Sequence, residues 1–465
     1  MERGPSPRPD PTARALFALA LLFGLTRFLR LGHWSLWVDE AHTLHDAIWM
    51  LVGDPPAYPL GYLAVRGVVQ LLGGATDEAV LRLFPALCGY VSIPLAAWAL
   101  RPAIGPTRAA ATALLLSVSS WHLFWSQSAR AYTLALALSL FGGGLWLRGV
   151  LGARRRYIVG GLAVGAAAAF AHPSAALLLP AWVAAPLLVG PLGGRLHVRP
   201  PTLLLTGVAL GGALAMGGWV ASVWGTYENV KGGSSLAHFA ATTGWFMTPL
   251  YLVGAAVGTW LAWVERRGED LLVALGVLVV ALCAAAAALF ARVAAQYVFV
   301  LLPWVAALAT GPVVRLRRPL LRLGWLALLC LPAACDSALY FTLRHGDRPR
   351  WKEAFAHVLE SRGAEDLVLA MHAPVAEYYL DPGATWLRTQ HAVVRLDPYS
   401  LASTDYWLRR GRRLWLVVSP EDLAAWNPTA RGRLLELLAQ EGRLESQYPV
   451  PWTPRDLLVQ VYVIG

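Results

Sequence analysis

Residues 14–46 read RALFALALLFGLTRFLRLG followed by HWSLWVDEAHTLHD. The first part is an apolar segment, and the second part holds an adjacent acid pair, Asp39 and Glu40, among aromatic residues. A helix needs about 20 apolar residues to cross the hydrocarbon core of a bilayer. The stretch therefore predicts a membrane-spanning helix that ends in an acidic loop at the membrane surface.

The composition of the whole chain extends this prediction. Hydrophobic residues make up 57% and charged residues 14% of the 465 residues, and the mean hydropathy is +0.51. These values are far from those of soluble proteins, and membrane-length apolar segments recur as far as Phe341. We therefore predict a polytopic α-helical membrane protein with about eleven transmembrane helices. Their approximate ranges are 14–32, 81–100, 108–125, 131–149, 157–171, 174–190, 202–224, 246–264, 271–290, 297–312 and 323–341.

The placement of arginine predicts the orientation in the inner (plasma) membrane. If the N-terminus is cytoplasmic, every inner connection contains arginines, as the positive-inside rule requires. The first outer loop is then residues 33–80, and residues 342–465 lie outside the cytoplasm. The net charge of +11 follows from inner loops that face anionic lipid, so it indicates no nucleic-acid partner. The inner arginines are Arg101, Arg108, Arg148, Arg154, Arg155, Arg156, Arg195, Arg199, Arg266, Arg267, Arg315, Arg317, Arg318 and Arg322.

The last part of the chain is more polar. Helix-like and strand-like runs alternate there, which predicts a small extracytoplasmic α/β domain at 342–465 after a transmembrane domain at 1–341. We expect helices at 351–361 and 430–440, and strands at 367–371, 414–418 and 457–464. All four cysteines of the chain fall in apolar segments instead, so we expect buried packing residues and neither a disulfide framework nor a metal site. They are Cys88, Cys283, Cys330 and Cys335.

The acid pair is the first candidate site. Asp39 and Glu40 follow Trp34 and Trp37, and tryptophans are enriched at the headgroup level of membranes. A carboxylate at that level could take a proton from an attacking hydroxyl or amine. The alternative is a solvated helix N-terminus, where the helix dipole favours acids.

The second candidate is the stretch Trp125–Tyr132, which reads WSQSARAY. Its arginine, Arg130, opens a predicted transmembrane helix on the outer side and so departs from the positive-inside pattern. A guanidinium at that depth suits bidentate binding of a phosphate. The alternative is an arginine that extends to the lipid headgroups.

Two further outer connections carry polar side chains. His172 and Pro173 form a tight turn, in which the histidine could bind a substrate or a metal, or bond to the backbone of the turn. Arg292, Gln296 and Tyr297 precede another predicted helix and add a cation and an aromatic hydroxyl on the same side.

A divalent metal is a further possibility for the first outer loop. Asp39, Glu40, His42, His45 and Asp46 lie within eight residues, and on a helix positions 39, 42 and 46 share a face. Carboxylates and imidazoles are ligand types for divalent ions. The spacing is not that of HExxH, however, so we assign no metal ligand and no certain cofactor.

With these residues in place, the chain resembles the GT-C class of integral-membrane glycosyltransferases, and within it the protein O-mannosyltransferases and aminoarabinose lipid A transferases. Trp37–Ala41 matches their Trp-x-Asp-Glu-Ala stretch, and Ser126–Tyr132 is similar to their Ser-Gln-Glu-Ala-Arg-Pro-Tyr signature. Tyr297 with Pro303 resembles their late Arg-Tyr…Pro segment. The succession of many helices and an outer domain also matches, so the likeness covers nearly the whole chain.

The resemblance implies a membrane glycosyltransferase that moves a sugar from a polyprenyl-phosphate-linked donor to an extracytoplasmic protein, lipid or glycan acceptor. It implies that Asp39 is the base or the acceptor-orienting carboxylate, that Glu40 supports it, and that Arg130 binds the donor phosphate. A single displacement would then invert the anomeric configuration. The expected phosphate-binding set is Arg130, Tyr132, Arg292 and Tyr297, and the expected pocket residues are Trp37, His42, Tyr58, Gln127, His172 and Gln296.

Three positions depart from the family pattern. Ser128 and Ala131 replace the usual Glu and Pro around Arg130, and Gln296 replaces the Arg of the late segment. Neutralisation of the phosphate would then fall to Arg130 together with Arg292.

Two other classes of protein share the apolar character. A lipid or glycan transporter or flippase could use Arg130 and Glu228 in a translocation path, but the two halves of the chain show no convincing internal repeat of the kind common in transporters. A non-catalytic membrane scaffold of the cell envelope would not need the acid pair. Sugar transfer by the purified protein would distinguish the three.

Overall fold

The computed structural model describes residues 10–49, 59–192, 236–289, 293–381 and 393–465. These residues form two compact units. Unit 1 takes in the described parts of Met1–Leu29, Met50–Gly67 and Leu83–Ser337. Unit 2 takes in those of Arg30–Trp49, Val68–Arg82 and Ala338–Gly465.

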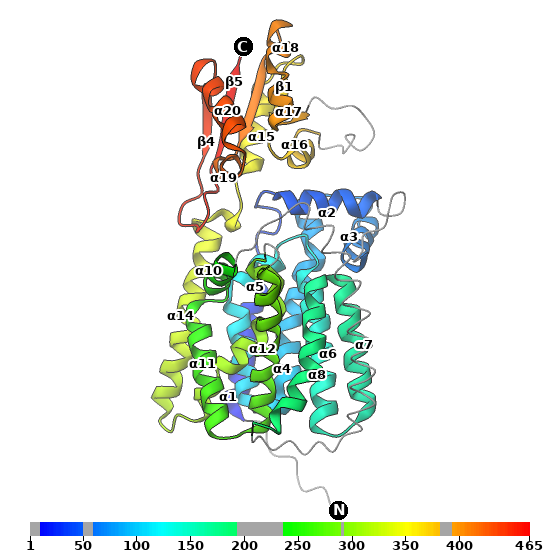
Figure 1. The fold of residues 1–465 in the computed structure, drawn as a ribbon, viewed down its shortest axis with the longest axis vertical. Coiled ribbons are helices and arrows are strands. Elements are labelled where there is room, and N and C mark those ends of the chain that lie inside the picture. The colour runs from blue at the N-terminus through cyan, green and yellow to red at the C-terminus, as the bar shows by residue number, and fades with distance from the viewer. Residues whose placement is uncertain (1–9, 50–58, 193–235, 290–292, 382–392) are drawn as a thin grey trace, which may run out of the picture. The chain divides into compact units, whose positions relative to one another are not determined.

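Helices dominate the part of the chain before Leu343 (Figure 1). Six of the described helical segments are long and apolar enough to cross a membrane, or seven if the bent pair α10 and α11 is one span. The helices before Ser128 are α1 (Pro11–Gly24), η1 (Leu25–Phe28), α2 (Val38–Trp49), α3 (Pro59–Leu71), α4 (Glu78–Val118) and α5 (Ser120–Ser126). Those after it are α6 (Tyr132–Leu151), α7 (Arg155–Ala171), η2 (Pro173–Leu177), α8 (Leu178–Val189), α10 (Leu236–Phe246), α11 (Pro249–Val264), α12 (Gly268–Ala288), η3 (Ala295–Leu301), α13 (Leu302–Ala309), η4 (Gly311–Val314) and α14 (Pro319–Thr342).

The difference from the predicted count has identifiable causes. Helix α4 has 41 residues and contains a non-helical residue, Gly105, with φ 78°, so it holds the predicted segment 81–100 and most of 108–125. Helix α7 has 17 residues, which is short of the roughly 20 that a perpendicular span requires. The predicted span 202–224 lies outside the described residues. The number of about eleven therefore stays a prediction.

Two local predictions of helix boundaries were wrong. The predicted loop 225–245 is helical from Leu236, where α10 begins. The predicted helix 108–125 is broken at Ser119, which has an extended backbone conformation. The Ser119 hydroxyl caps α5 by accepting a hydrogen bond from the His122 amide. Serine favours this capping position because its hydroxyl competes with the helical backbone for hydrogen bonds.

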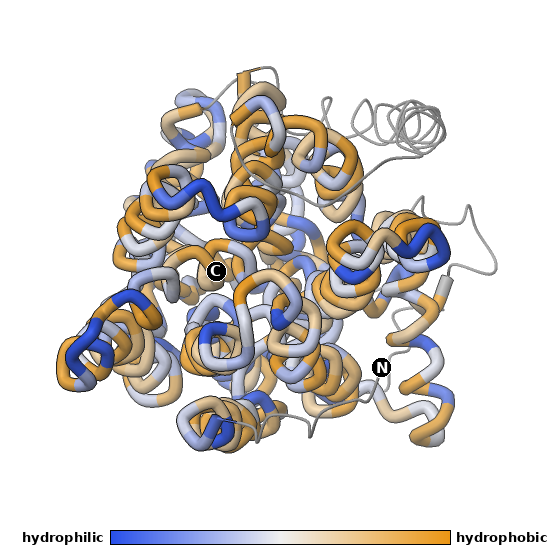
Figure 2. The backbone as a smooth tube through the Cα atoms, turned by 90° about the horizontal axis from the view of Figure 1, so that it is seen from below, coloured by the Kyte–Doolittle hydropathy of each residue, from blue (hydrophilic) through white to orange (hydrophobic). Residues whose placement is uncertain are grey.

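The helices of unit 1 expose apolar side chains on their outer surfaces. Leu22 is 62%, Trp263 59% and Leu282 59% exposed, and Figure 2 shows hydrophobic residues on many of the helices seen along their axes. Contiguous exposed apolar surface of this kind is unfavourable in water but natural against lipid tails. The chain is therefore a membrane protein.

The side chain of Cys335 is exposed, which corrects the expectation that all four cysteines are buried.

Unit 2 contains a five-stranded sheet with the strand order β2-β1-β3-β5-β4. Strands β2 (Val393–Arg395), β1 (Leu367–Ala370) and β3 (Leu414–Val418) are parallel, with Val368 opposite both Val393 and Trp415. Strand β5 (Val459–Ile464) runs antiparallel to β3 and to β4 (Arg443–Tyr448). The helices between the strands are α15 (Trp351–Ser361), α16 (Ala373–Leu380), α17 (Pro398–Leu401), α18 (Thr404–Arg409), α19 (Pro420–Ala424) and α20 (Pro428–Gln440), and the short η5 (His345–Asp347) precedes them.

Alternate residues of each strand face two separate hydrophobic cores, as the period of two dictates. Leu416 and Ile464 pack against Leu434 of α20 on one face. On the other face, Val417 and Val461 belong to a core that also contains α15 and α16. Ala41 of α2 is part of that second core, so the helix that carries the acid pair packs against the sheet of unit 2.

The apolar patterning had predicted most of these elements. Helix α15 and strand β3 have the predicted limits, and β1, β5 and α20 differ from prediction by one to two residues at an end. Strands β2 and β4 were missed because β2 has three residues and β4 has the polar sequence RLESQY. The domain boundary after residue 341 stays a prediction.

Candidate active site

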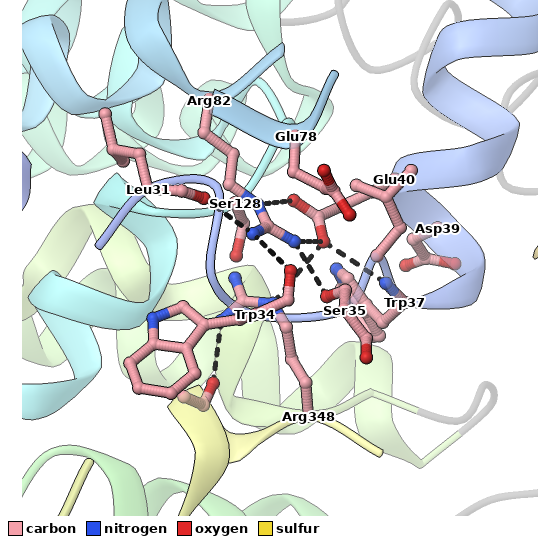
Figure 3. A network of polar contacts seen from close by, with 12 residues as sticks. Leu31, Trp34, Ser35, Trp37, Asp39, Glu40, Glu78, Arg82, Ser128 and Arg348 are labelled. Atoms are coloured by element: carbon pink, nitrogen blue, oxygen red, sulfur yellow. Dashed lines mark hydrogen bonds and ion pairs between the residues drawn. The ribbon is translucent and has the colours of Figure 1, made fainter. Parts of the chain in front are cut away.

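The acid pair lies in the first turn of α2. Glu40 is wholly buried (0% exposed), whereas Asp39 is half-buried. Figure 3 shows the Asp39 carboxylate pointing away from the guanidinium groups that surround Glu40. Two adjacent carboxylates therefore have different environments, because successive residues of a helix face directions about 100° apart.

Glu40 forms a bidentate ion pair with Arg82 of α4. Arg82 Nε donates to Glu40 Oε1 and Nη2 donates to Oε2, both at 2.8 Å, and neither side chain is exposed. The other N–H groups of Arg82 donate to the carbonyl oxygens of Leu31, Trp34 and Ser35 at 2.8 to 2.9 Å. All five donors of the guanidinium are thus used. Arg82 fixes the loop before α2 and the first turn of α2 at the same time.

A second arginine completes this network. Arg348 Nε lies 3.4 Å from Glu40 Oε2, and Arg348 Nη1 donates to Tyr340 Oη at 3.0 Å and to the Gly346 carbonyl at 2.7 Å. Arg348 is also 0% exposed. The Trp37 amide donates to Glu40 Oε2 at 3.2 Å. Buried charges persist when they are paired and hydrogen-bonded in this way.

Arg82 and Arg348 were both missed in the sequence. Arg82 had a detectable signal, since it falls inside a predicted transmembrane segment, where a charged residue marks a buried partner or a function. Arg348 stands in the polar sequence HGDRPR, which gives no such signal. The geometry gives Glu40 a positioning role, and its direct contact with a substrate stays a prediction.

The other predicted residues of this loop lie on the more exposed part of α2. His42 and His45 are exposed, and Trp37 is half-buried. His45 Nδ1 lies 3.3 Å from Asp46 Oδ1. Among the described residues, no three His, Cys, Asp or Glu side chains come together in a group that could hold a metal ion. Tyr58 lies outside the described residues.

Unit 1 gathers several of the predicted phosphate-binding and pocket residues. Tyr132 opens α6, and its ring lies 4.2 Å from the His172 ring, which in turn lies 6.2 Å from the Tyr297 ring. Arg130 is half-buried two residues before Tyr132. The stretch 126–132 and the connections that carry His172 and Tyr297, far apart in sequence, therefore meet in one place. That this place binds a phosphate stays a prediction.

His172 is neutral in this setting. Its burial and the charge of Arg130 lower the pKa of the imidazole to about 3. The Ser174 amide and its hydroxyl lie 3.3 and 2.8 Å from Nδ1. Since a backbone N–H can only donate, Nδ1 is the acceptor and Nε2 carries the proton. A neutral imidazole adds no charge that would repel a cation or attract an anion.

Gln127, which was predicted to line the substrate pocket, makes hydrogen bonds to the backbone of another segment. It is 0% exposed, and its amide nitrogen donates to the carbonyl oxygens of Thr26, Arg27 and Leu29 at 2.7 to 3.3 Å. These carbonyls lie at the end of η1, where the helical bonds stop. The side chain thus holds the segment that carries Arg130 against the end of the first helix.

A buried arginine, Arg27, also anchors this segment. Arg27 Nη2 lies 2.9 Å from His122 Nδ1, and His122 Nε2 lies 2.8 Å from Ser92 Oγ. Arg27 also donates to the carbonyl oxygens of Leu116, at 3.0 Å, and Ser117. This chain connects η1, α4 and α5, and α5 leads directly into the Arg130 stretch. Arg27 falls within the first predicted transmembrane segment, 14–32.

The remaining predicted residues are placed as follows. Gln296 and Tyr297 are half-buried in η3, and Arg292 lies outside the described residues. Asp39 belongs to unit 2 and Arg130 to unit 1.

No protein-family model matches the chain, and no curated protein matches it. Solved structures do match it. ArnT from Cupriavidus metallidurans, bound to undecaprenyl phosphate, is 15% identical, covers 98% of both chains and has a TM-score of 0.58. The Archaeoglobus fulgidus oligosaccharyltransferase in the apo form is 10% identical over 97% of this chain and 76% of that chain, also with a TM-score of 0.58.

The chain has the GT-C fold. A third structure agrees: AglB from Archaeoglobus fulgidus, in complex with an inhibitory peptide and a dolichol-phosphate, is 10% identical over 98% of this chain and 74% of that chain, with a TM-score of 0.53. The fold resemblance inferred from the motifs is thus confirmed. In this GT-C chain the acidic helix α2 belongs to unit 2 and the Arg130 stretch to unit 1.

Proposed function

We propose that the protein is a membrane glycosyltransferase that moves a sugar from a polyprenyl-phosphate-linked donor to an extracytoplasmic acceptor. The observation that carries the proposal is the acid pair of a GT-C chain, in which a buried Glu40–Arg82 ion pair fixes the helix that presents a half-buried Asp39. The solved neighbours, bound to undecaprenyl phosphate and to a dolichol-phosphate, support the lipid-phosphate carrier.

The reaction is one displacement. The acceptor hydroxyl or amine attacks the anomeric carbon. Asp39 either takes the proton of this acceptor group or orients the acceptor for the attack. The bond between the anomeric carbon and the phosphate oxygen breaks on the opposite face of the sugar, so the anomeric configuration inverts. The lipid phosphate leaves as an anion.

Arg130 binds and neutralises the leaving phosphate. A positioned cation in a site of low dielectric can lower the activation barrier by several kcal/mol. A guanidinium can also donate two parallel hydrogen bonds to the phosphate oxygens. Tyr132, Tyr297 and Arg292 complete the phosphate-binding set. The ring of His172 packs against Tyr132 and borders this set without adding charge.

The acceptor is an extracytoplasmic protein, lipid or glycan, and the protein works in the inner (plasma) membrane with residues 342–465 outside the cytoplasm. We expect the substrate to contact Trp37, His42, Tyr58, Gln127, His172 and Gln296. No step of the reaction is assigned to a metal ion.

The test is sugar transfer by the purified protein in detergent or nanodiscs. A panel of radiolabelled polyprenyl-phosphate sugars (mannosyl, glucosyl and aminoarabinosyl) is incubated with crude cell-envelope acceptors. We expect transfer from at least one donor, its loss in Asp39→Asn, and its retention in the control Asp46→Asn on the same helix. Equal activity of Asp39→Asn and wild type excludes Asp39 as the base, and movement of intact donor across a vesicle membrane without transfer supports a flippase.

A further inference from the structure

Helix α16 of the sheet domain reaches the loop that carries the acid pair. Tyr379, near the end of α16, accepts a hydrogen bond from the Leu36 amide at 2.6 Å and donates one to Glu78 Oε1 at 3.1 Å. Leu36 precedes α2 by two residues and Glu78 is the first residue of α4. One hydroxyl thus joins the starts of the two helices that carry Glu40 and Arg82.

The apolar face of α2 packs on the same helix. Val38 and Ala41 of α2 belong to one hydrophobic core with Val375 and Ala376 of α16. The Tyr379 ring stacks on Phe355 with 6.2 Å between centroids. Apolar contacts of this kind are not directional, so they leave the rotation of α2 about its own axis to be set by hydrogen bonds.

Lys352 and Tyr378 add contacts around this point. Lys352 Nζ lies 3.1 Å from Glu78 Oε1 and donates to the Gly32 carbonyl at 3.2 Å. Tyr378 Oη donates to the Thr76 carbonyl at 3.0 Å. Tyr378 therefore bonds to the turn before α4, whereas Tyr379 bonds to the backbone that leads directly into α2.

The Tyr379 hydroxyl stays protonated at all physiological pH values. Its burial and the nearby Glu78 carboxylate raise the pKa of the phenol well above its ordinary value. The hydroxyl can therefore donate to Glu78 while it accepts from Leu36, which is the full use of a phenol as donor and acceptor.

We propose that Tyr379 is a positioning residue for Asp39: its hydroxyl fixes the backbone at Leu36 and thereby the direction of the first turn of α2. The inference rests on the proposed function of Asp39. It assigns to the C-terminal sheet domain a part in catalysis, because the domain holds the catalytic helix in its orientation.

The test compares Tyr379→Phe with the matched control Tyr378→Phe. Both variants lose one buried phenol hydroxyl and keep the ring, so a general effect on folding should be similar in both. A misplacement of about 1 Å in a reacting group can lower a rate about a hundredfold. We expect kcat of Tyr379→Phe to fall at least about tenfold with donor KM within about twofold, and Tyr378→Phe to keep both near wild type. The donor is the one that the transfer panel identifies.

Hydrogen exchange gives a readout that needs no substrate. Loss of its acceptor should increase exchange of the Leu36 amide about tenfold in Tyr379→Phe, in line with about 1.4 kcal/mol for one hydrogen bond, and leave it unchanged in Tyr378→Phe. Wild-type kcat and wild-type exchange in Tyr379→Phe would overturn the positioning role. If wild type transfers sugar from none of the donors, the proposed function fails. If Asp39→Asn is as active as wild type, the proposed role of Asp39 fails. If Asp39→Asn is inactive and Tyr379→Phe is fully active, only the positioning role fails.

Discussion

The Glu40 carboxylate and the Arg82 guanidinium form a bidentate ion pair with two hydrogen bonds of 2.8 Å, and neither side chain is exposed. The pair joins the first turn of α2 to the start of α4. The pair holds Glu40, the neighbour of the proposed base Asp39, and thereby fixes the turn of α2 that carries both acids.

Glu40→Gln should destabilise the protein strongly. The substitution leaves the charges of Arg82 and Arg348 buried without their anion, and breaking a buried pair costs about 3–5 kcal/mol. The midpoint of thermal unfolding in detergent, followed by size-exclusion chromatography, measures the effect. Glu421→Gln is the control, since its partner Arg455 is 52% exposed and such surface pairs are worth less than about 1 kcal/mol. Equal shifts of the unfolding midpoint in both variants would show that the Glu40 ion pair stabilises the protein no more than a surface pair does.

Arg130→Ala should weaken binding of the lipid phosphate. A charge-assisted hydrogen bond contributes about 1.5–3 kcal/mol, which predicts a rise of about ten- to a hundredfold in the Kd for undecaprenyl phosphate. Titration by microscale thermophoresis measures it, with Arg156→Ala at the start of α7 as the control. An unchanged Kd in Arg130→Ala would remove this residue from the phosphate site.

Because of His345, the free energy of unfolding should fall as the pH is lowered from 6.5 to 3. Burial, followed by the charges of Arg350 and Arg348, lowers the pKa of this histidine to about 3. Between pH 6.5 and 3 the unfolded chain binds a proton at His345 and the folded chain does not, so unfolding is favoured by up to about 1.4 kcal/mol for each pH unit. Above pH 6.5 both states are neutral and the group contributes nothing.

The variant His345→Asn should flatten this acid dependence. His345 has φ 48°, and asparagine tolerates that left-handed backbone well. Unfolding midpoints at pH 7 and pH 5 are compared with wild type and with His45→Asn, whose histidine is exposed. A slope in His345→Asn as steep as that of wild type would show that other groups cause the acid sensitivity.

Gly346→Ala should destabilise unit 2 more than Gly411→Ala. Both glycines have positive φ, 64° and 70°, so both variants bear the strain of a left-handed alanine, about 1–2 kcal/mol. At Gly346 the new Cβ would also lie 2.7 Å from Trp34 Cγ, whereas nothing lies within 4 Å at Gly411. Thermal unfolding of the two variants measures the difference, and equal midpoints would mean that the Trp34 ring moves away without cost.

A cysteine at Ser361 tests the topology. In a background with the four native cysteines changed to alanine, Ser361→Cys should react with an impermeant thiol reagent in intact cells, because the end of α15 is exposed and the parity of the predicted spans places it outside the cytoplasm. Arg155→Cys, in a predicted inner connection, should react only after lysis. Protection of Ser361→Cys in intact cells would reverse the predicted orientation.

The sequence was most informative where a local pattern is sufficient. Apolar runs located β3 and α15, because burial on one or both faces leaves a clear periodicity. Asp39 was selected as a candidate because acids are scarce near the bilayer and the Trp-x-Asp-Glu-Ala stretch surrounds it; its role stays a prediction. Tyr132, His172 and Tyr297 were proposed together because their connections were all predicted on one side of the membrane, and their rings lie near one another; their binding role stays a prediction.

The sequence was least informative where partners are remote. Arg82 lies 42 residues and Arg348 lies 308 residues from Glu40, and no periodicity records such pairs. Glu40 was predicted to support Asp39, and neither of its arginine partners could be recognised from the sequence. The same applies to Ala41, because an alanine on an amphipathic helix does not reveal that it packs in the core of a sheet more than 300 residues later.

The composition of unit 2 from three separate stretches, Arg30–Trp49, Val68–Arg82 and Ala338–Gly465, constrains how such a protein can change. A recombination event near residue 342 would exchange the sheet but leave behind α2, whose Ala41 fits the old core. Chimeras between distant homologues should therefore express well only if the first loop and the C-terminal sheet are inherited together.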